Sequence, residues 1–195
     1  MELKPRQLEI LKAAGAILNE EGVGGLTTKN LAKRVGFTES ALYRHYASKE
    51  EILVALLQYL HASMKERLPP IALMTNLAPD ERLRRLFGSQ LEYLKEHPHF
   101  LVAIFSDGLL KFSPAIKEGM LRIMFLMRSA VLRIMEDGQN NKVFTARIPA
   151  EELTHIFMGS FRLLMLQWHI EDFKFDIKVG ENQHIENLIS LISIK

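Results

Sequence analysis

The segment VGFTESALYRHYASKE, residues 35–50, contains the strongest structural signal in this chain. Gly36 separates two short segments with helical apolar spacing, and Thr38 opens the second of them. Glycine readily adopts the left-handed conformation that ends a helix, and threonine is a favoured N-cap residue. Residues 43–45 then carry more hydrogen-bonding groups than a short solvated helix requires. The pattern predicts a tight turn between two helices, the second of which presents a binding face.

Another helix is expected ahead of this pair. Apolar residues recur at three- and four-residue steps after Pro5, which suits a first turn, and Gly22 is expected to end this helix. Thr27 or Thr28 is expected to cap the second helix, which ends at Gly36. Three short helices with a glycine turn between the last two fit a helix-turn-helix.

The rest of the chain also has a helical pattern. A fourth helix is expected from Lys49 to about Leu68, where Pro69-Pro70 ends it. No alternating segment of useful length predicts a strand. We therefore predict an all-α fold, with an N-terminal three-helix domain over residues 1–48 and a larger helical bundle over residues 49–195. Within that bundle the expected helices are 79–96, 100–111, 114–137, 149–171 and 181–194.

The amino-acid composition excludes several classes of protein. The 195 residues are 48% hydrophobic, enough for a real core, and they include no cysteine. A disulfide framework, a thiolate metal site and a cysteine nucleophile are therefore excluded. The N-terminus MELKPRQLEI lacks the apolar core of a signal peptide, and no apolar run approaches the ~18 residues of a membrane span. We expect a cytoplasmic protein with no membrane partner.

The net charge of +2 is small, but its distribution is uneven. Residues 26–49 carry a net charge of +4, so the rest of the chain sums to −2. A basic excess around the predicted turn is typical of a polyanion-binding surface. The charged residues in this window are Lys29, Lys33, Arg34, Arg44 and Lys49 against Glu39.

In a helix-turn-helix the second helix lies in the major groove, and its N-terminal residues meet base edges. Lys49, together with Thr28 and Lys29 at the start of the second helix, is expected to contact phosphates. The alternative, on periodicity alone, is a structural three-helix module whose tyrosines pack and whose charges face water. The residues expected to meet bases or flanking phosphates are Thr38, Glu39, Ser40, Ala41, Tyr43, Arg44 and His45.

The segment EEGVGGLTTKNLAKRVGFTESALYRHYASKEEIL, residues 20–53, resembles the N-terminal DNA-binding domain of the TetR family of transcriptional regulators. The resemblance runs from about Leu8 to Leu56; Phe37 and Tyr46 depart from the residues usual there. It implies an all-helical homodimer, operator DNA bound by the N-terminal domains, and an effector site in the C-terminal bundle. It rests on Gly22, Leu26-Thr27-Thr28, Leu31-Ala32, Gly36, Leu42-Tyr43, His45, Lys49-Glu50 and Leu53. It places Thr28, Thr38, Tyr43, His45 and Lys49 at family DNA-contact positions.

The last two expected helices are candidates for the dimer interface. Helix 149–171 is apolar over an arc too wide for the surface helix of a monomer. With the resemblance, this favours a four-helix interface with two helices from each subunit. The alternative is that both helices pack only within their own subunit. The expected interface stripe on helix 181–194 is Ile185, Leu188, Ile189 and Ile192.

Methionine and aromatic residues at helical spacing suggest a lipophilic pocket in the bundle. Asp107 is the only acid in segment 100–112, so a neutral or anionic effector is favoured, with Lys111 or Arg122 available for an anionic head group. The same pattern is also typical of plain core, and that alternative stays open. The candidate pocket residues are Phe105, Met120, Met124, Met127, Phe157, Phe161, Met165 and Trp168.

Catalysis is not expected. Glu152-x-x-His155 and Glu181-x-x-His184 match the pattern of helical di-iron carboxylate proteins, but both pairs sit near expected helix starts. Ser160 lacks the setting of a nucleophile elbow, and no P-loop or dinucleotide fingerprint is present. No cofactor and no metal site are expected. The alternative function is a helical di-iron or other small-molecule-binding protein without a DNA role.

We therefore predict a DNA-binding transcriptional regulator, a repressor, that binds near-palindromic double-stranded operator DNA as a homodimer. A small lipophilic effector in the bundle would release it by moving the fourth helix and changing the spacing of the two recognition helices. The effector, the operator sequence, the regulated genes and the sign of regulation are left open.

Overall fold

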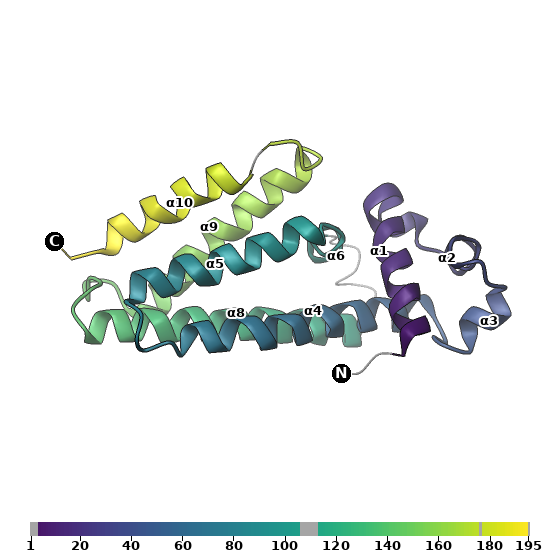
Figure 1. The fold of residues 1–195 in the computed structure, drawn as a ribbon, viewed down its shortest axis with the longest axis horizontal. Coiled ribbons are helices and arrows are strands. Elements are labelled where there is room, and N and C mark those ends of the chain that lie inside the picture. The colour runs from purple at the N-terminus through teal and green to yellow at the C-terminus, as the bar shows by residue number, and fades with distance from the viewer. Residues whose placement is uncertain (1–3, 106–112, 176, 195) are drawn as a thin grey trace. The chain divides into compact units, whose positions relative to one another are not determined.

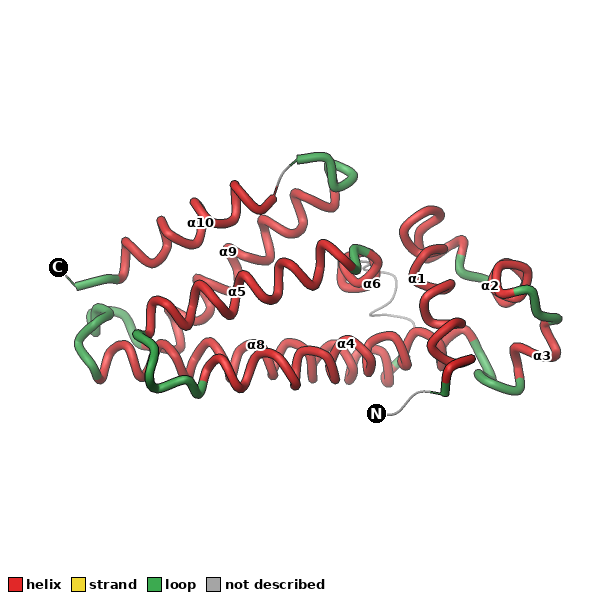
Figure 2. Tube along the Cα trace, viewed as in Figure 1, coloured by secondary structure: helices red, strands yellow, loops and turns green. Residues whose placement is uncertain are grey.

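The computed structural model describes residues 4–105, 113–175 and 177–194. Helices make up almost all of the regular structure in these ranges (Figures 1 and 2), which confirms the all-α class. Residues 106–111 of the expected helix 100–111 lie outside the described residues. The helices are α1 (Pro5–Gly25), α2 (Thr28–Val35), α3 (Glu39–Tyr43), α4 (Lys49–Ala72), α5 (Pro79–Glu96), α6 (His99–Phe105), α8 (Pro114–Asn140), α9 (Ala150–Ile170) and α10 (Ile177–Ile192).

Packing divides the chain into two compact units. The first unit combines Met1–Ser63 with Glu96–Ile123, and the second combines Met64–Lys95 with Met124–Lys195. Helices α4 and α8 each contribute residues to both units. The expected division after residue 48 concerns function rather than packing, and it stays a prediction.

The expected capping residues define the helices of the N-terminal region. Gly22 has a φ of +67°, outside helical space, so the regular part of α1 ends there as predicted. Of the two candidate threonines, Thr27 is the N-cap of α2, and its hydroxyl accepts from the Asn30 amide. Gly36 is left-handed, with a φ of +69°, and Thr38 caps α3 by accepting from the Ala41 amide. Leu31 and Leu42 are buried on the inner faces of α2 and α3.

A close approach joins α6 to α1 within the first unit. A Cβ added to Gly15 would lie 2.8 Å from the ring of His99, so only glycine permits this contact. The imidazole ring also packs against Phe100, with ring centroids 4.3 Å apart. Burial lowers the pKa of His99 to about 4, and the charge of His97 adds to the effect. His99 is therefore neutral near pH 7.

Helix α4 continues beyond its expected end. Pro69 and Pro70 lie inside the helix, which runs to Ala72 rather than ending at Leu68. Because proline has no N–H, the carbonyls of Lys65 and Glu66 lack the bonds that residues 69 and 70 would normally donate in this last turn. The Ala72 carbonyl, one of the unpaired acceptors of that turn, accepts from the buried Arg82 guanidinium at 2.8 Å. Arg82 also pairs with Asp137 of α8 at 2.9 Å, so one side chain joins three helices of the second unit.

The end of α10 is tied to the loop between α8 and α9. The Thr145 amide donates to Ile192 O at 2.7 Å, and the Ile194 amide donates to Val143 O at 2.9 Å. Phe144, between these two bonds, is fully buried. The C-terminal segment is therefore an integral part of the second unit, and α10 begins at Ile177 rather than at the expected residue 181.

The depressed pKa of His99 predicts acid sensitivity. Because the unfolded chain takes up a proton near pH 6.5 and the folded chain only near pH 4, the His99 contribution is complete above pH 6.5 and is lost as the pH falls towards 4. The expected loss is about 1–3 kcal/mol of unfolding free energy. Urea unfolding at pH 7.0, 5.5 and 4.5 measures it. His99→Gln should flatten this pH dependence, whereas His155→Gln, at an exposed position on α9, should leave it unchanged.

Candidate nucleic-acid interface

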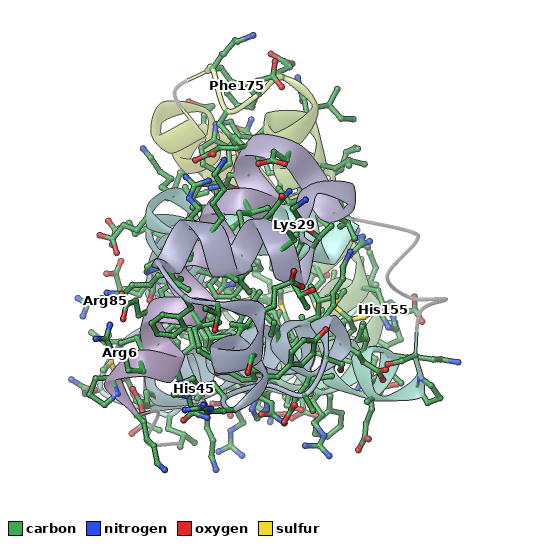
Figure 3. All side chains as sticks on the ribbon, turned by 90° about the vertical axis from the view of Figure 1, so that its right-hand side faces the viewer. Arg6, Lys29, His45, Arg85, His155 and Phe175 are labelled. Atoms are coloured by element: carbon green, nitrogen blue, oxygen red, sulfur yellow. The ribbon has the colours of Figure 1, made fainter. Side chains whose placement is uncertain are left out.

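The residues around the Gly36 turn form an exposed polar face on α2 and α3. Figure 3 views this end of the chain and labels Lys29 and His45 on it. Tyr43 is 49% exposed although it is a large aromatic residue. Thr28, Ala41, His45 and Lys49 are half-buried. The other residues expected at the DNA, namely Lys29, Thr38, Glu39, Ser40 and Arg44, are exposed.

A hydrogen bond links the first residues of α2 and α3. The Thr28 hydroxyl donates to Glu39 Oε2 at 2.9 Å. Because Thr27 and not Thr28 caps α2, the Thr28 side chain is available for this bond. The sequence predicted Thr28 as a phosphate contact and Glu39 as a base contact. It did not predict that the two would touch, since eleven positions separate them.

Aromatic packing positions the end of α3. The His45 ring stacks on Phe37, with centroids 6.0 Å apart, and the Arg6 guanidinium lies 5.6 Å from the Phe37 centroid. Tyr46 is buried, and burial together with the Glu51 charge raises its pKa to about 12. Phe37 and Tyr46, the two departures from the usual TetR residues, therefore support this face from behind.

Lys49 has a structural bond of its own. Its ammonium donates to Val23 O at 2.7 Å, and burial lowers its pKa. This bond joins the first turn of α4 to the turn after Gly22. Two of its three N–H groups remain for another acceptor.

Arg34 adds less positive charge to the surface than the sequence suggested. Its guanidinium forms two hydrogen bonds to the Glu20 carboxylate, at 2.6 and 2.5 Å. The hydrogen bond from Arg34 lowers the pKa of Glu20, so the pair is ionised at neutral pH. Glu20 lies on α1, outside the window in which the sequence counted charge. Lys29, Lys33 and Arg44 are exposed cations of this face.

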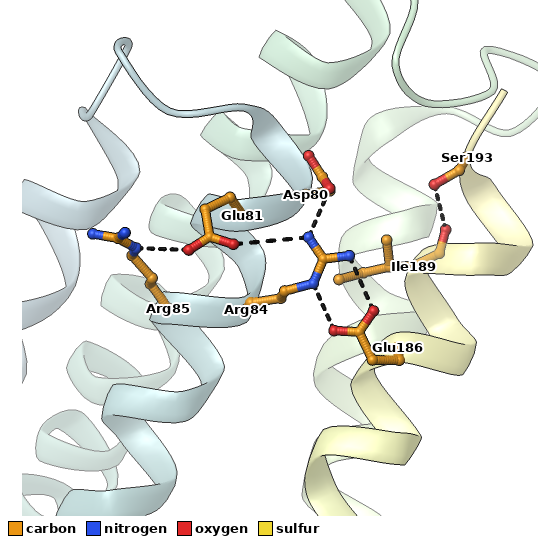
Figure 4. Close-up of polar contacts among 7 residues, drawn as sticks. All are labelled: Asp80, Glu81, Arg84, Arg85, Glu186, Ile189 and Ser193. Atoms are coloured by element: carbon orange, nitrogen blue, oxygen red, sulfur yellow. Dashed lines mark hydrogen bonds and ion pairs between the residues drawn. The ribbon is translucent and has the colours of Figure 1, made fainter. Parts of the chain in front are cut away.

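Three of the four residues expected to form the dimer stripe on α10 are buried within the chain itself. Ile185, Ile189 and Ile192 are 3%, 3% and 5% exposed, and Leu188 is half-buried. The isoleucine side chains are therefore part of the core of the second unit. One reason is the ion pair that holds α10 against α5, in which Arg84 binds Glu186 through two hydrogen bonds of 2.5 and 3.0 Å (Figure 4).

Another apolar face is exposed on the last two helices. Ile156, Leu163 and Ile170 recur every seven residues on α9, with exposed fractions of 48%, 66% and 70%. On α10 the side chain of Leu191 is 78% exposed, and Ile194, which follows the helix end, is 53% exposed. The two expected interface helices therefore do carry an unburied apolar surface, but on residues that the sequence did not select.

The candidate pocket residues fall into both units. Phe105 is half-buried and Met120 is buried in the first unit. In the second unit Phe157 and Phe161 pack on Phe87 of α5, with ring centroids 6.2 and 5.1 Å apart.

Other candidate pocket residues lie at the surface. Met124 is 49% exposed and so is not a core residue. Arg122, suggested as a partner for an anionic head group, forms a surface ion pair with Glu118 instead. Met127, Phe157, Phe161, Met165 and Trp168 are buried; Asp107 and Lys111 lie outside the described residues.

The described residues of the alternative di-iron site do not come together as a metal-binding group. Glu152 and His155 are exposed on α9, and the Glu181 side chain lies outside the described residues. His184 forms a 2.6 Å hydrogen bond with Ser160. Within the described ranges, no three acidic or histidine side chains form a group able to hold a metal ion. No described helix combines the length and apolar content needed to cross a membrane.

The geometry defines a helix-turn-helix domain joined to helices with an apolar core and an exposed apolar face. Residues 10–56 match the family model for bacterial regulatory proteins of the tetR family. The chain is 28% identical over 151 residues to the HTH-type transcriptional repressor NicS of Pseudomonas putida, covering 76% of this chain and 69% of NicS. Alignments with two other curated relatives span only 56% and 52% of their lengths.

Solved structures share the fold over nearly the whole chain. The fatty acid degradation regulator FadR of Bacillus halodurans has a TM-score of 0.85 at 15% identity, covering 97% of both chains. FadR of Bacillus subtilis, in complex with stearoyl-CoA, has a TM-score of 0.80 at 17% identity, covering 96% of this chain and 98% of that one. Residues 10–56 therefore form the DNA-binding domain that is typical of the TetR family. The proteins named above are a transcriptional repressor and two regulators.

Proposed function

We propose that this protein is a transcriptional repressor that binds operator DNA with α3 in the major groove. The main support for the proposal is the exposed N-terminus of α3, which follows the left-handed Gly36. The exposed cations Lys29 and Arg44 lie on the same face. Thr38 uses its side chain to cap α3, so the remaining polar groups of the first turn can meet base edges. Lys29 and the remaining N–H groups of Lys49 would contact phosphates.

The proposed assembly is a homodimer formed through the exposed apolar face of α9 and α10. Isolated surface leucines are ordinary, but several in register on one helix mark an interaction site. A homodimer repeats the same surface on both subunits. It would also present two copies of α3 to a near-palindromic operator, with half-sites about one helical turn apart.

The proposed effector is a small lipophilic molecule that enters the aromatic core of the second unit. Phe87, Phe157 and Phe161 supply flat apolar surfaces, and the buried Trp168 Nε1 donor has no hydrogen-bond partner within the described part of the chain. A buried donor of this kind suits a lipophile that carries an acceptor. The stearoyl-CoA bound to FadR of Bacillus subtilis makes fatty acyl compounds the first class to test.

Helix α4 offers a route from the effector to the DNA. It is continuous from Lys49, which bonds Val23 O in the first unit, to Ala72, whose carbonyl accepts from Arg82 in the second. An effector that preferred a different packing around α4 would shift the population of recognition-helix spacings. The effector would release DNA to the extent that it binds the state with the mismatched spacing more tightly than the DNA-binding state.

Lys29→Ala tests the DNA proposal. Because one phosphate contact is lost, affinity should fall on all sequences, and the slope of log K against log salt should become shallower by about 0.9. Fluorescence anisotropy on operator DNA selected from a random pool, at several salt concentrations, measures both. Lys65→Ala, at an exposed position of α4, is the matched control and should behave as wild type. Failure of the wild-type protein to enrich any duplex would overturn the proposal.

Leu163→Glu tests the dimer face. A carboxylate at this 66% exposed position should leave the fold intact but produce monomers in light scattering, because it would be buried without a partner in the dimer. Leu73→Glu, at a 61% exposed leucine after α4, should remain dimeric. Ile189→Glu should instead lower the unfolding free energy by roughly 3 kcal/mol or more, because its site is core. An unchanged dimer for Leu163→Glu contradicts the proposed face.

The fluorescence of Trp168, the only tryptophan, tests the effector proposal. Titration with fatty acids or acyl-CoA esters should shift or quench its emission and weaken operator binding over the same concentration range. Phe161→Ala should weaken this response, because it removes an aromatic wall beside Phe87. If every lipophile class leaves both the emission and operator binding unchanged, the effector site is not in this core.

A further inference from the structure

We infer that Glu39 determines sequence specificity by accepting a hydrogen bond from the N4 amino group of a cytosine in each half-site, and that Thr28 positions its carboxylate. This inference rests on the proposed function and gives it a specific base. Glu39 is the first residue of α3 and is exposed at the end of the helix that would enter the groove.

The position of the carboxylate is defined from two sides. Thr38 caps α3 through the Ala41 amide at 3.1 Å, which fixes the backbone from which Glu39 extends. The Thr28 hydroxyl then donates to Glu39 Oε2 at 2.9 Å from the first turn of α2. A carboxylate has about four acceptor positions, so one hydroxyl leaves capacity for a base. A long side chain that is held at its tip loses less conformational freedom on binding than an unrestrained one.

The carboxylate also lies where its charge is tolerated. The exposed Lys29 and Arg44 on the same face offset its repulsion by DNA phosphates. Without a compensating contact, an acidic side chain on a basic DNA-binding face would weaken DNA binding. The presence of Glu39 there is consistent with a role in base recognition.

Hydrogen-bond chemistry selects cytosine. An ionised carboxylate only accepts, and the major-groove donors are cytosine N4 and adenine N6. On adenine the N7 acceptor lies beside N6 and would face the second carboxylate oxygen. Cytosine has no acceptor of its own on its major-groove edge. A contact of this kind should favour cytosine over the other bases by roughly five- to a hundredfold.

The experiment is selection from random double-stranded DNA with the full-length protein, followed by affinity measurement on single-base variants of the selected site. Wild type should require cytosine at one position of each half-site. Glu39→Gln should change that preference to adenine, because a carboxamide can accept from N6 and donate to N7. Glu9→Gln removes the same charge from an exposed α1 position that pairs with Arg6, and it should keep cytosine.

Thr28 is tested as a positioning residue. Thr28→Val removes the hydroxyl and keeps the side-chain shape, and the N-cap Thr27 is untouched. Discrimination for cytosine should fall several-fold while the preferred base stays the same. Thr28→Ser restores a hydroxyl and should restore the discrimination, which a purely structural role of the methyl group would not do.

The outcomes separate this inference from the proposed function. If wild type selects no sequence, the proposed function fails. If wild type and Glu39→Gln select the same bases with the same discrimination, Glu39 is not a base reader, although the protein remains a DNA-binding regulator. A uniform gain of affinity in Glu39→Gln on all sequences would show that Glu39 acts only through repulsion. Unchanged discrimination in Thr28→Val would overturn the positioning role.

Discussion

The left-handed conformation of Gly36 is the constraint on which the DNA-binding face depends. At a φ of +69° its amide can reach back to the carbonyls of Ala32 and Lys33, which ends α2 and turns the chain within two residues. Side chains with a Cβ adopt this conformation at a cost of roughly 1 kcal/mol or more. Because the turn is so short, Thr38 follows at once as the cap of α3. Gly36 therefore sets the angle between α2 and α3. That angle brings Thr28 within hydrogen-bonding distance of Glu39.

Several side chains that look like DNA contacts in the sequence also support the domain that presents them. Lys49 bonds Val23 O, Thr28 bonds Glu39, and His45 stacks on Phe37. Such secondary roles make the face rigid before DNA arrives, which reduces the conformational entropy lost on binding. A substitution on this face can therefore change the stability of the domain as well as its affinity for DNA. Matched control variants are needed to separate the two effects.

In the helical bundle, packing between distant segments determines more than the local sequence pattern does. The spacing of Ile185, Ile189 and Ile192 indicated an apolar stripe and was interpreted as a dimer interface, but hydrophobic periodicity cannot distinguish the core of one subunit from the interface between two. The Arg84–Glu186 ion pair, between residues 102 positions apart, helps to orient α10 so that this stripe faces inward. The exposed Leu163, part of a seven-residue repeat with Ile156 and Ile170, was visible in the sequence only as one apolar residue in a wide apolar arc.

The helical class, the order of the helices and the turn chemistry could be predicted from the sequence, because glycine conformation, threonine capping and apolar spacing are local properties of the chain. Residues concentrated between Gly22 and Leu53 also indicated the family of the N-terminal domain. Three features became visible only in the folded chain: the buried face of α10, the position of Pro69 and Pro70 within the last turn of α4, and the ion pair between Glu20 and Arg34. Each of these depends on groups distant in sequence that meet only when the chain folds, so no local pattern could contain them.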